Sequence, residues 1–367
     1  DETSTLWACF LVDFSQSVQW PVVIIILASH CQGSDFESGI YFASLAARLG
    51  SLLSIPLSVS LMNHCNWRWV SFLASVCAIL SLFISYSFIK DTPSEWHRPQ
   101  NPIVKIRERE ESRNNQYSDL DFEKKVYLCI KTYAINMKIS ISQSLQHVLG
   151  SSLFWITAVT HAGDAMIGSS QRILGIYYFE SSRGSLDEGF TSGLPVVLST
   201  GTILGLAIAG NIFKSLNTRE RKVMIGRLYL LCICSCYSLS ILSLSVIHRL
   251  MDEPELILVF QLISTFFMGF GIAVQSMIPG IIGGRFGRYK GLFSAYTDGV
   301  AFGLSSLVWR VVCNSVRGTE SDGWPYCWAT IALLVIVCAA VMLEFFDKFF
   351  NNGDNHKRDH ETTITFL

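Results

Sequence analysis

Long apolar segments separated by polar connections occupy most of this chain. Each apolar segment reaches or approaches the ~20 residues that a helix needs to cross a hydrocarbon layer of ~30 Å. Because a backbone in lipid must satisfy its own hydrogen bonds, segments of this length are expected to be helices. The pattern therefore predicts an all-α polytopic membrane protein. Its nine predicted spans are residues 5–28, 39–62, 69–89, 152–179, 192–213, 225–247, 255–281, 291–313 and 325–346.

A long polar connection divides the spans into a group of three and a group of six. It is rich in Arg, Glu, Asn and Gln and has little apolar periodicity, as a linker should. We expect three helices in residues 1–89, the linker at 90–151, six helices in 152–350 and a polar tail at 351–367. If the two halves are symmetric, three further spans precede residue 1. On that expectation the chain is N-terminally truncated and does not transport by itself.

Composition narrows the class of protein. The chain has 367 residues, of which 50% are hydrophobic and 16% charged, and its mean hydropathy is +0.38. The composition of the chain is too apolar for an ordinary soluble domain. The formal net charge of −1 gives no reason to expect nucleic acid as a partner. The eleven cysteines lack the spacing of a zinc site or a redox pair, so neither a metal nor a cofactor is expected.

The placement of positive charge predicts the orientation. Most of the 28 Lys and Arg residues fall in the linker, in the connections at 214–227 and 285–290, and in the tail. The positive-inside rule places these parts in the cytoplasm. Whether the membrane is the plasma membrane or an internal one, such as the endoplasmic reticulum, does not follow from this pattern.

The fourth predicted span carries the densest set of polar residues. They recur at i, i+3, i+7, i+10, i+11 and i+14, which places them on one helical face: His161, Asp164, Gly168, Gln171, Arg172 and Gly175. A charged group at the bilayer centre costs ~2.5–3.5 kcal/mol on insertion scales, so this face is expected to line an aqueous cavity. Arg172 is expected to bind a phosphate or carboxylate through its planar fork. His161 and Asp164 are suited to exchange a proton near neutral pH. The alternative is that Asp164 and Arg172 pair with neighbouring helices and fix the packing.

Two other spans add candidate residues for the cavity. Asp13, Gln16 and Trp20 share a face of the first span. There Trp20 offers a flat ring to a sugar or base, and Gln16 offers hydrogen bonds to hydroxyls. The alternative places Asp13 near the non-cytoplasmic water and Trp20 at the membrane interface. Arg48, in the second span, either pairs with Asp13 or supplies positive charge to the cavity.

The eighth predicted span carries Tyr296 and Asp298 close to its cytoplasmic end. Tyr296 is a further candidate for the cavity lining. Asp298 either forms a gate pair with Arg285 or Arg288 or faces water.

Small residues four positions apart predict close contacts between helices. Gly201 and Gly205 have this spacing in the fifth span, and Gly299 and Gly303 have it in the eighth. We expect both pairs to let a neighbouring backbone approach closely.

Several short motifs stand at fixed places relative to the spans. QSVQWP occupies residues 16–21, Arg48-Leu49-Gly50 leads on to Pro56, and Asn66-Trp67-Arg68-Trp69 opens the third span. Asp91-Thr92-Pro93-Ser94-Glu95 follows that span, and GIIGGRFGRYKGLFSAYTD occupies residues 280–298. Together these motifs resemble those of the major facilitator superfamily of transporters, over essentially the whole chain.

The resemblance implies two six-helix halves that rock around a midplane site and expose it to each side in turn. It identifies the nine spans with helices 4 to 12 of the superfamily. The first three spans are most similar to the organophosphate:phosphate antiporters, including the glucose-6-phosphate exchangers. That likeness implies a lipid bilayer and a small-molecule solute as partners, with an organic anion or sugar phosphate exchanged for inorganic phosphate. Lys214 departs from the pattern, because the superfamily often has an acidic residue there, and the latch ascribed to that loop is therefore not implied.

Other functions remain open at this stage. Arg48 and Arg172 are matched by Asp13 and Asp164, so charge alone does not establish an anionic solute. A proton-coupled transporter of a neutral sugar, a nucleoside or a carboxylate is the alternative, and so is a non-transporting scaffold of the same fold. An enzyme is not expected, since the chain contains no HExxH motif, GxSxG motif or aspartate dyad. The number of spans argues against a seven-span receptor.

Overall fold

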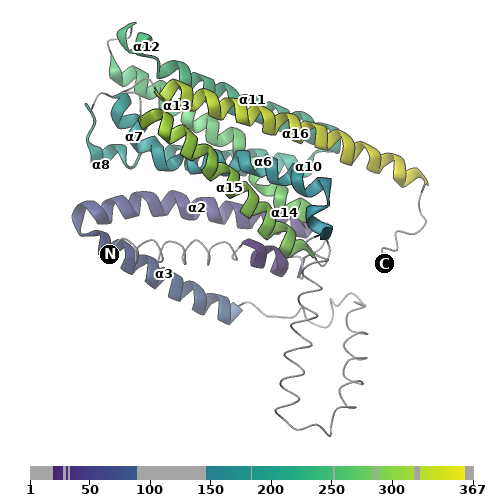
Figure 1. Cartoon of the computed structure of the whole chain (residues 1–367). Coiled ribbons are helices and arrows are strands. Elements are labelled where there is room, and N and C mark those ends of the chain that lie inside the picture. The colour runs from purple at the N-terminus through teal and green to yellow at the C-terminus, as the bar shows by residue number, and fades with distance from the viewer. Residues whose placement is uncertain are drawn as a thin grey trace.

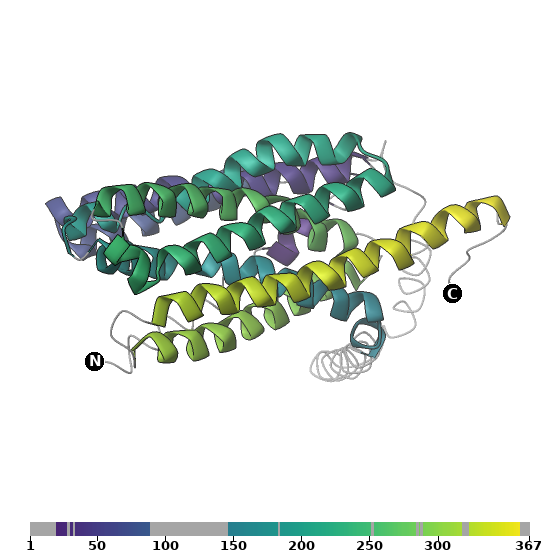
Figure 2. The same cartoon turned by 90° about the horizontal axis from the view of Figure 1, so that it is seen from above.

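The structure is a computed structural model, and it describes residues 20–27, 30–31, 34–88, 146–182, 184–250, 253–283, 286, 289–317 and 323–359. Every regular element in these ranges is helical, which confirms the all-α prediction. The helices lie alongside one another in an elongated bundle (Figures 1 and 2).

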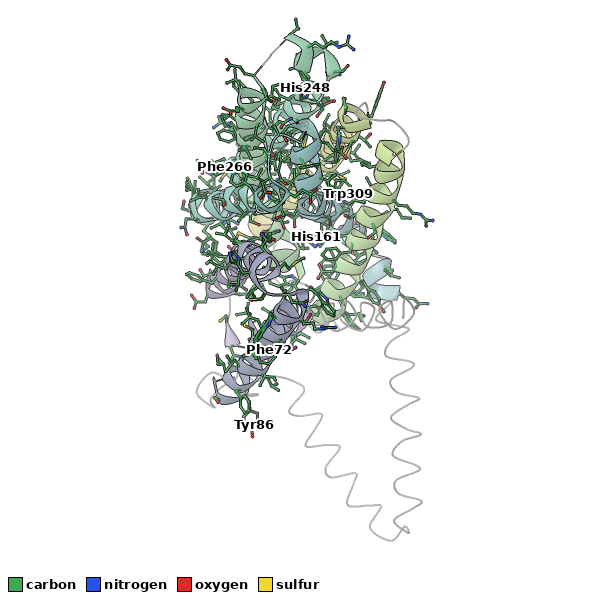
Figure 3. All side chains as sticks on the ribbon, turned by 90° about the vertical axis from the view of Figure 1, so that its left-hand side faces the viewer. Phe72, Tyr86, His161, His248, Phe266 and Trp309 are labelled. Atoms are coloured by element: carbon green, nitrogen blue, oxygen red, sulfur yellow. The ribbon has the colours of Figure 1, made fainter. Side chains whose placement is uncertain are left out.

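The first half contributes a helical segment at residues 20–27, then α2 (Ser34–His64) and α3 (Trp67–Phe88). The helices α2 and α3 occupy the second and third predicted spans, whereas residues 5–19 of the first span lie outside the described residues. Apolar side chains of α3, including Phe72 and Tyr86, point outward from the bundle (Figure 3). In a membrane protein such side chains face lipid, so their exposure is consistent with a spanning helix.

The second half is a layered bundle built from the remaining helices. Their bounds are α6 (Ser152–Ser169), α7 (Gln171–Ser181), α8 (Glu188–Thr191), α9 (Val196–Gly205), η3 (Leu206–Gly210), α10 (Asn211–Ser215), α11 (Thr218–Leu242), α12 (Ser245–Leu250), α13 (Pro254–Ile272), η4 (Ala273–Met277), α14 (Ile278–Gly283), α15 (Lys290–Arg317) and α16 (Gly323–Asp359). Helix α11 packs against α13 and α16, α9 against α13, and α6 against α15 and α16. The packing places α6 in the middle of the bundle, between the first half and the outer helices (Figure 1).

Large side chains fill the interior of this second half. Phe154, Tyr177, Phe293 and Trp328 are fully buried. The Tyr177 ring lies 5.3 Å from the Trp328 ring, which joins α7 to α16. The Tyr178 hydroxyl donates to Thr265 Oγ1 at 2.6 Å and joins α7 to α13. The buried aromatic rings of α7 and their hydroxyl groups therefore fix the orientation of this helix, which follows α6 along the chain.

Glycines allow α9 and α13 to pack closely, as the sequence predicts for one of its two pairs. A Cβ at Gly201 would overlap the carbonyl oxygen of Phe266, and one at Gly205 would lie 2.6 Å from the carbonyl oxygen of Phe270. The prediction for Gly299 and Gly303 is wrong, because a Cβ at either meets nothing within 4 Å in the described part of the chain. That face of α15 is exposed, so no neighbouring backbone approaches it there.

Two spans lose regular α-helical geometry toward their C-terminal ends. The π-helical turn η3 interrupts the fifth span, and the 3₁₀ turn η4 interrupts the seventh. The two turns contact each other and both contact α2. A small apolar cluster, with Ile40 and Tyr41 of α2 and Leu206 of η3 among its members, fills this contact. The irregular turns thus lie where the second half meets the first.

Six helices among the described residues are long and apolar enough to cross a membrane: Asp35–His64, Trp67–Ser87, Glu188–Ser215, Arg219–Leu242, Pro254–Gly283 and Gly323–Phe346. The two other predicted spans of the second half, 152–179 and 291–313, are also helical. They are less apolar because they carry His161, Asp164 and Asp298. The division of the chain at residues 89, 151 and 350 stays a prediction.

Candidate functional site

Asp164 of α6 stands at the centre of a group of charged side chains. Its side chain is only 5% exposed. Arg48 Nη2, from α2, donates to both of its carboxylate oxygens at 3.3 and 3.4 Å. These distances exceed the 2.7–2.9 Å of a strong charge-assisted hydrogen bond. The pair therefore joins the two halves of the molecule through a loose contact with one nitrogen of the guanidinium group.

His161 lies one turn before Asp164 on the same face of α6. Its Nε2 is 3.0 Å from Oδ1 of Asp298, on α15. Its Nδ1 is 3.7 Å from Asp164 Oδ2, too far for a hydrogen bond. One imidazole thus stands between two carboxylates from two helices. We call Arg48, Asp164, His161 and Asp298 the charge network.

The packing of α6 against α15 brings His161 and Asp298 together. Trp309 of α15 donates its indole N–H to the Met166 carbonyl oxygen at 3.1 Å. The Phe302 ring, one turn after Asp298, lies edge-on to the imidazole with a centroid distance of 6.3 Å. Figure 3 shows His161 and Trp309 toward the middle of the bundle.

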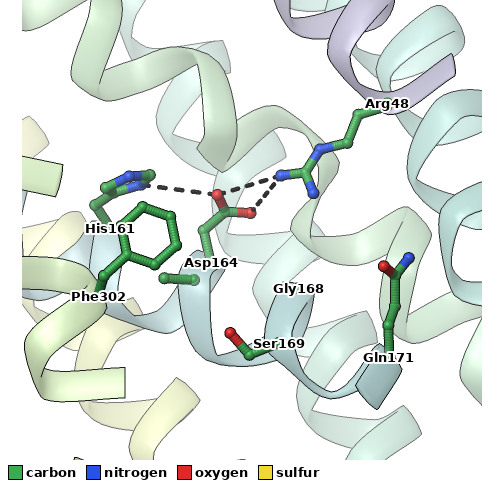
Figure 4. Close-up of a pocket in the computed structure, with 8 residues that line it drawn as sticks. Arg48, His161, Asp164, Gly168, Ser169, Gln171 and Phe302 are labelled. Carbon is green, nitrogen blue, oxygen red and sulfur yellow. Dashed lines mark hydrogen bonds and ion pairs between the residues drawn. The ribbon is translucent and has the colours of Figure 1, made fainter. Parts of the chain in front are cut away.

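A cavity of about 250 Å³ opens beside the charge network (Figure 4). It is lined by Arg48, His161, Asp164, Ala165, Gly168, Ser169, Gln171 and Phe302. Gly168 lies next to the guanidinium, since a Cβ there would be in van der Waals contact with Arg48 Nη1 at 3.7 Å. Gln171 donates its amide to the Ser199 hydroxyl of α9. The lining combines one cation, one buried carboxylate, an imidazole and neutral hydrogen-bonding groups.

The charge of the network depends on His161. One cation and two carboxylates leave a single negative charge while the imidazole is neutral, and no net charge once it is protonated. Charged groups inside a membrane protein are costly unless they are paired or hydrated. The balance between these two states can therefore be changed by a small charged solute in the cavity.

Four of the predicted site residues, which belong to α2, α6 and the start of α7, lie together in the structure. His161, Asp164, Gln171 and Arg48 all line the cavity. Arg48 pairs with Asp164. Asp13 and Gln16 lie outside the described residues, so the predicted pairing of Arg48 with Asp13 stays a prediction. Arg172 belongs to α7, but its side chain is not among those described.

The remaining predicted residues lie elsewhere. Trp20 is half-buried and packs against the apolar cluster at the start of α2, and Tyr296 packs against the core of the second half. Asp298 pairs with His161 inside the bundle. Arg285 and Arg288 lie outside the described residues, so their pairing with Asp298 as a gate stays a prediction.

Some residues near the cavity escaped the sequence analysis. Ser169 follows His161 by eight positions, so helical spacing alone was enough to place it on the same face. Phe302 follows Asp298 by one helical turn, so a prediction that Asp298 faces inward would have been enough to place Phe302 at the cavity. Tyr229 of α11, a buried residue within electrostatic range of Asp164, had no sequence signal.

Among the described residues, no three His, Cys, Asp or Glu side chains are arranged as a metal site requires. The described side chains that line the cavity offer hydrogen bonding, ion pairing and proton exchange.

A second set of contacts joins the halves where α2 begins. Lys214 Nζ lies 3.6 Å from the centroid of the Tyr41 ring, and Arg221 Nη2 lies 3.8 Å from Glu37 Oε2. Arg221 also donates to the carbonyl oxygen of Lys214 at 3.1 Å. We call Glu37, Tyr41, Lys214 and Arg221 the end clasp. Lys214, in the last turn of α10, thus contacts an aromatic ring of α2.

The family model of the Major Facilitator Superfamily matches residues 3–305, which is most of the chain. No curated protein sequence matches it.

Proposed function

The chain belongs to the major facilitator superfamily and is a secondary transporter, and we propose that its solute is a small organic anion, such as a sugar phosphate, exchanged for inorganic phosphate. It is an integral, multi-pass membrane protein, so the lipid bilayer surrounds it. The observation that carries the proposal is the position of Arg48 at the cavity, against Asp164 of the opposite half.

Arg48 is suited to hold an anion. Its side chain is 25% exposed, and in the part of the chain that the structure describes only Nη2 has a hydrogen-bond partner. Nε and Nη1 therefore remain for a ligand, and a guanidinium offers its donors in a fork that matches phosphate or carboxylate. The Gln171 side-chain amide and the Ser169 hydroxyl, which also line the cavity, suit the hydroxyls of a sugar.

The ion pair also offers a mechanism for alternating access. Arg48 belongs to α2 of the first half and Asp164 to α6 of the second. A solute anion that takes the place of the Asp164 carboxylate separates the halves at this point, and its own contacts then decide which way they rock. Inorganic phosphate and a sugar phosphate share the group that competes with Asp164, which makes an exchange between them chemically simple.

The test is counterflow into proteoliposomes that contain the complete protein. The vesicles are preloaded with unlabelled inorganic phosphate and offered labelled phosphate outside. We expect saturable uptake that sugar phosphates inhibit. If correctly folded protein shows no exchange of phosphate or sugar phosphate, the proposed solute is wrong.

Arg48→Gln tests the residue that carries the proposal. Losing a hydrogen bond to a charged group costs about 1.5–3 kcal/mol, on the order of a tenfold to hundredfold loss in apparent affinity. Arg68→Gln is the matched control, since Arg68 is an exposed arginine at the start of α3. Arg172→Gln is expected to abolish anion transport as well. Unchanged kinetics in Arg48→Gln would remove Arg48 from the solute site.

One observation favours a second candidate, a proton-coupled transporter of a neutral sugar, a nucleoside or a carboxylate. Asp164 already neutralises Arg48, and His161 lies between two carboxylates as a proton site would. For this candidate, uptake of a neutral solute should follow an imposed proton gradient and should not be inhibited by phosphate. The same vesicles distinguish the two candidates.

A further inference from the structure

His161 presents an unused proton-binding nitrogen to a carboxylate. Its Nε2 is taken by Asp298, so in the neutral ring the proton sits on Nε2 and Nδ1 carries the lone pair. This Nδ1 is buried and has no hydrogen-bond partner among the described residues. The nearest charged atom is Oδ2 of Asp164, at 3.7 Å. A lone pair opposite a carboxylate is unfavourable, and a proton on Nδ1 would turn that contact into an attraction.

Asp164 is shared between Arg48 and this nitrogen. While Arg48 holds the carboxylate, part of its negative charge is compensated, so it favours the binding of a proton at His161 less than an unpaired carboxylate would. When Arg48 is occupied by another anion, Asp164 loses its cation and faces the imidazole alone. The added anion also increases the negative charge around the ring. Both effects raise the affinity of Nδ1 for a proton.

Charged and polar groups near His161 come from several of the surrounding helices. Asp298 of α15 and Arg48 of α2 are the charged partners besides Asp164. On the side of Asp164, α11 contributes Tyr229 and α16 contributes Cys338, whose Sγ donates to the Val159 carbonyl oxygen at 3.3 Å. Phe302 is apolar. Among these described neighbours, Asp164 is the one that lies next to both Arg48 and His161.

We propose that anion binding at Arg48 and proton binding at His161 are coupled through Asp164, so that the transporter takes up one proton as it binds its anion. The proton passes from the water of the cavity to Nδ1 of His161 and leaves from there when the anion is released. This coupling rests on the proposed function, because it requires an anion at Arg48. By linkage, an anion that strengthens proton binding must itself bind more tightly as the pH falls.

The test measures the affinity of the complete protein for an anion whose own charge does not change with pH. Glucose 6-sulfate serves, since its sulfate ester remains singly charged where phosphate titrates. We expect its affinity, measured by calorimetry in detergent or nanodiscs, to rise from about pH 8 to about pH 6, the range in which histidine changes charge. The expected rise is on the order of 5- to 100-fold: coupling between two sites is usually at least fivefold, and uptake of one proton changes the affinity at most tenfold per pH unit.

Two variants separate this coupling from a merely structural role. Asp164→Asn removes the competitor for Arg48, so the affinity should be high and should depend on pH much less than in the wild type. His161→Gln removes the proton site, so the affinity should stay low, as in the wild type at high pH, and should also be independent of pH. His64→Gln, at an exposed histidine at the end of α2, is the matched control and should retain the wild-type dependence.

Each possible result either supports or overturns the proposed coupling. A rise in affinity at low pH that His161→Gln loses and Asp164→Asn weakens supports the coupling, and a rise that either variant retains in full overturns it. Binding that is independent of pH in the wild type overturns the coupling and leaves the anion site intact. No binding of glucose 6-sulfate, inorganic phosphate or glucose 6-phosphate at any pH overturns the proposed function and the coupling with it. If Asp164→Asn does not fold, a pH dependence that persists in His161→Gln is sufficient to overturn the proposal.

Discussion

Asp164 and His161 show how single residues set the properties of the cavity. Asp164 compensates Arg48, and His161 lies between Asp164 and Asp298. Removing any one of these side chains leaves another charge or dipole inside the bundle without compensation. Because a buried unpaired charge is costly, we expect substitutions here to affect affinity and folding together, which is why paired variants are needed.

At the same scale, two glycines of the sequence differ in what surrounds them. We expect Gly201→Ala to destabilise the protein by about 1–3 kcal/mol, the usual cost of overpacking, because its Cβ would overlap the Phe266 carbonyl oxygen. Gly303→Ala is the control, since open space surrounds Gly303 and alanine is the better helix former. Thermal unfolding in detergent measures both. Equal melting temperatures for the two variants would contradict the close packing of α9 on α13.

At the scale of elements, the irregular turns coincide with the contact between the halves. The turns η3 and η4 lie against each other and against α2, and the end clasp lies at the same end of α2. Irregular turns within helices often occur at functional positions, because they lack part of the regular hydrogen-bond ladder. We infer that the spans bend at these turns when the second half moves relative to α2 of the first half.

The end clasp makes a prediction at this scale. Tyr41→Leu removes the ring under Lys214 but keeps an apolar side chain, so the contact should weaken by about 0.5–2 kcal/mol. The population with this end open should therefore rise. Distances between spin labels placed at the start of α2 and the start of α11 measure the change. Tyr86→Leu, at an exposed tyrosine of α3, is the control, and identical distance distributions in both variants would contradict the role of the clasp.

At the scale of the whole molecule, charge and topology determine how the bundle sits in its membrane. The connection at 214–227 is rich in Lys and Arg and lies at the end of the bundle where α2 begins. The connection between α7 and α8 follows helices that run toward the opposite end of the bundle. The start of α2 and the α10–α11 turn meet in the end clasp, as they should if both face the cytoplasm. The orientation itself stays a prediction of the positive-inside rule.

This orientation can be measured with single cysteines in a background whose native cysteines are replaced by Ser. We expect Ser185→Cys, in the connection before α8, to react with an impermeant maleimide that is confined to the non-cytoplasmic side of the sealed membrane. Arg219→Cys, at the start of α11, should react only after the membrane is opened. The opposite pattern would invert the assigned topology without affecting the fold.

The sequence by itself determined the elements and one face of the site. Apolar runs located the helices α2, α3, α11 and α16, because burial in lipid demands long apolar segments. Helical spacing placed His161, Asp164 and Gln171 on one side of α6 and the start of α7, and the structure has all three at the cavity. Both inferences depend only on local geometry, which the order of residues specifies.

Only the tertiary structure decided which helix faces which. Arg48 and Asp164 are 116 positions apart, so no local pattern could pair them. Trp20 packs into an apolar cluster instead of lining the cavity, and Lys214 contacts a ring on α2. Asp298 meets His161 because α15 packs on α6. Periodicity states which residues share a face, whereas the partner of that face follows from how every helix in the bundle fills space against the others.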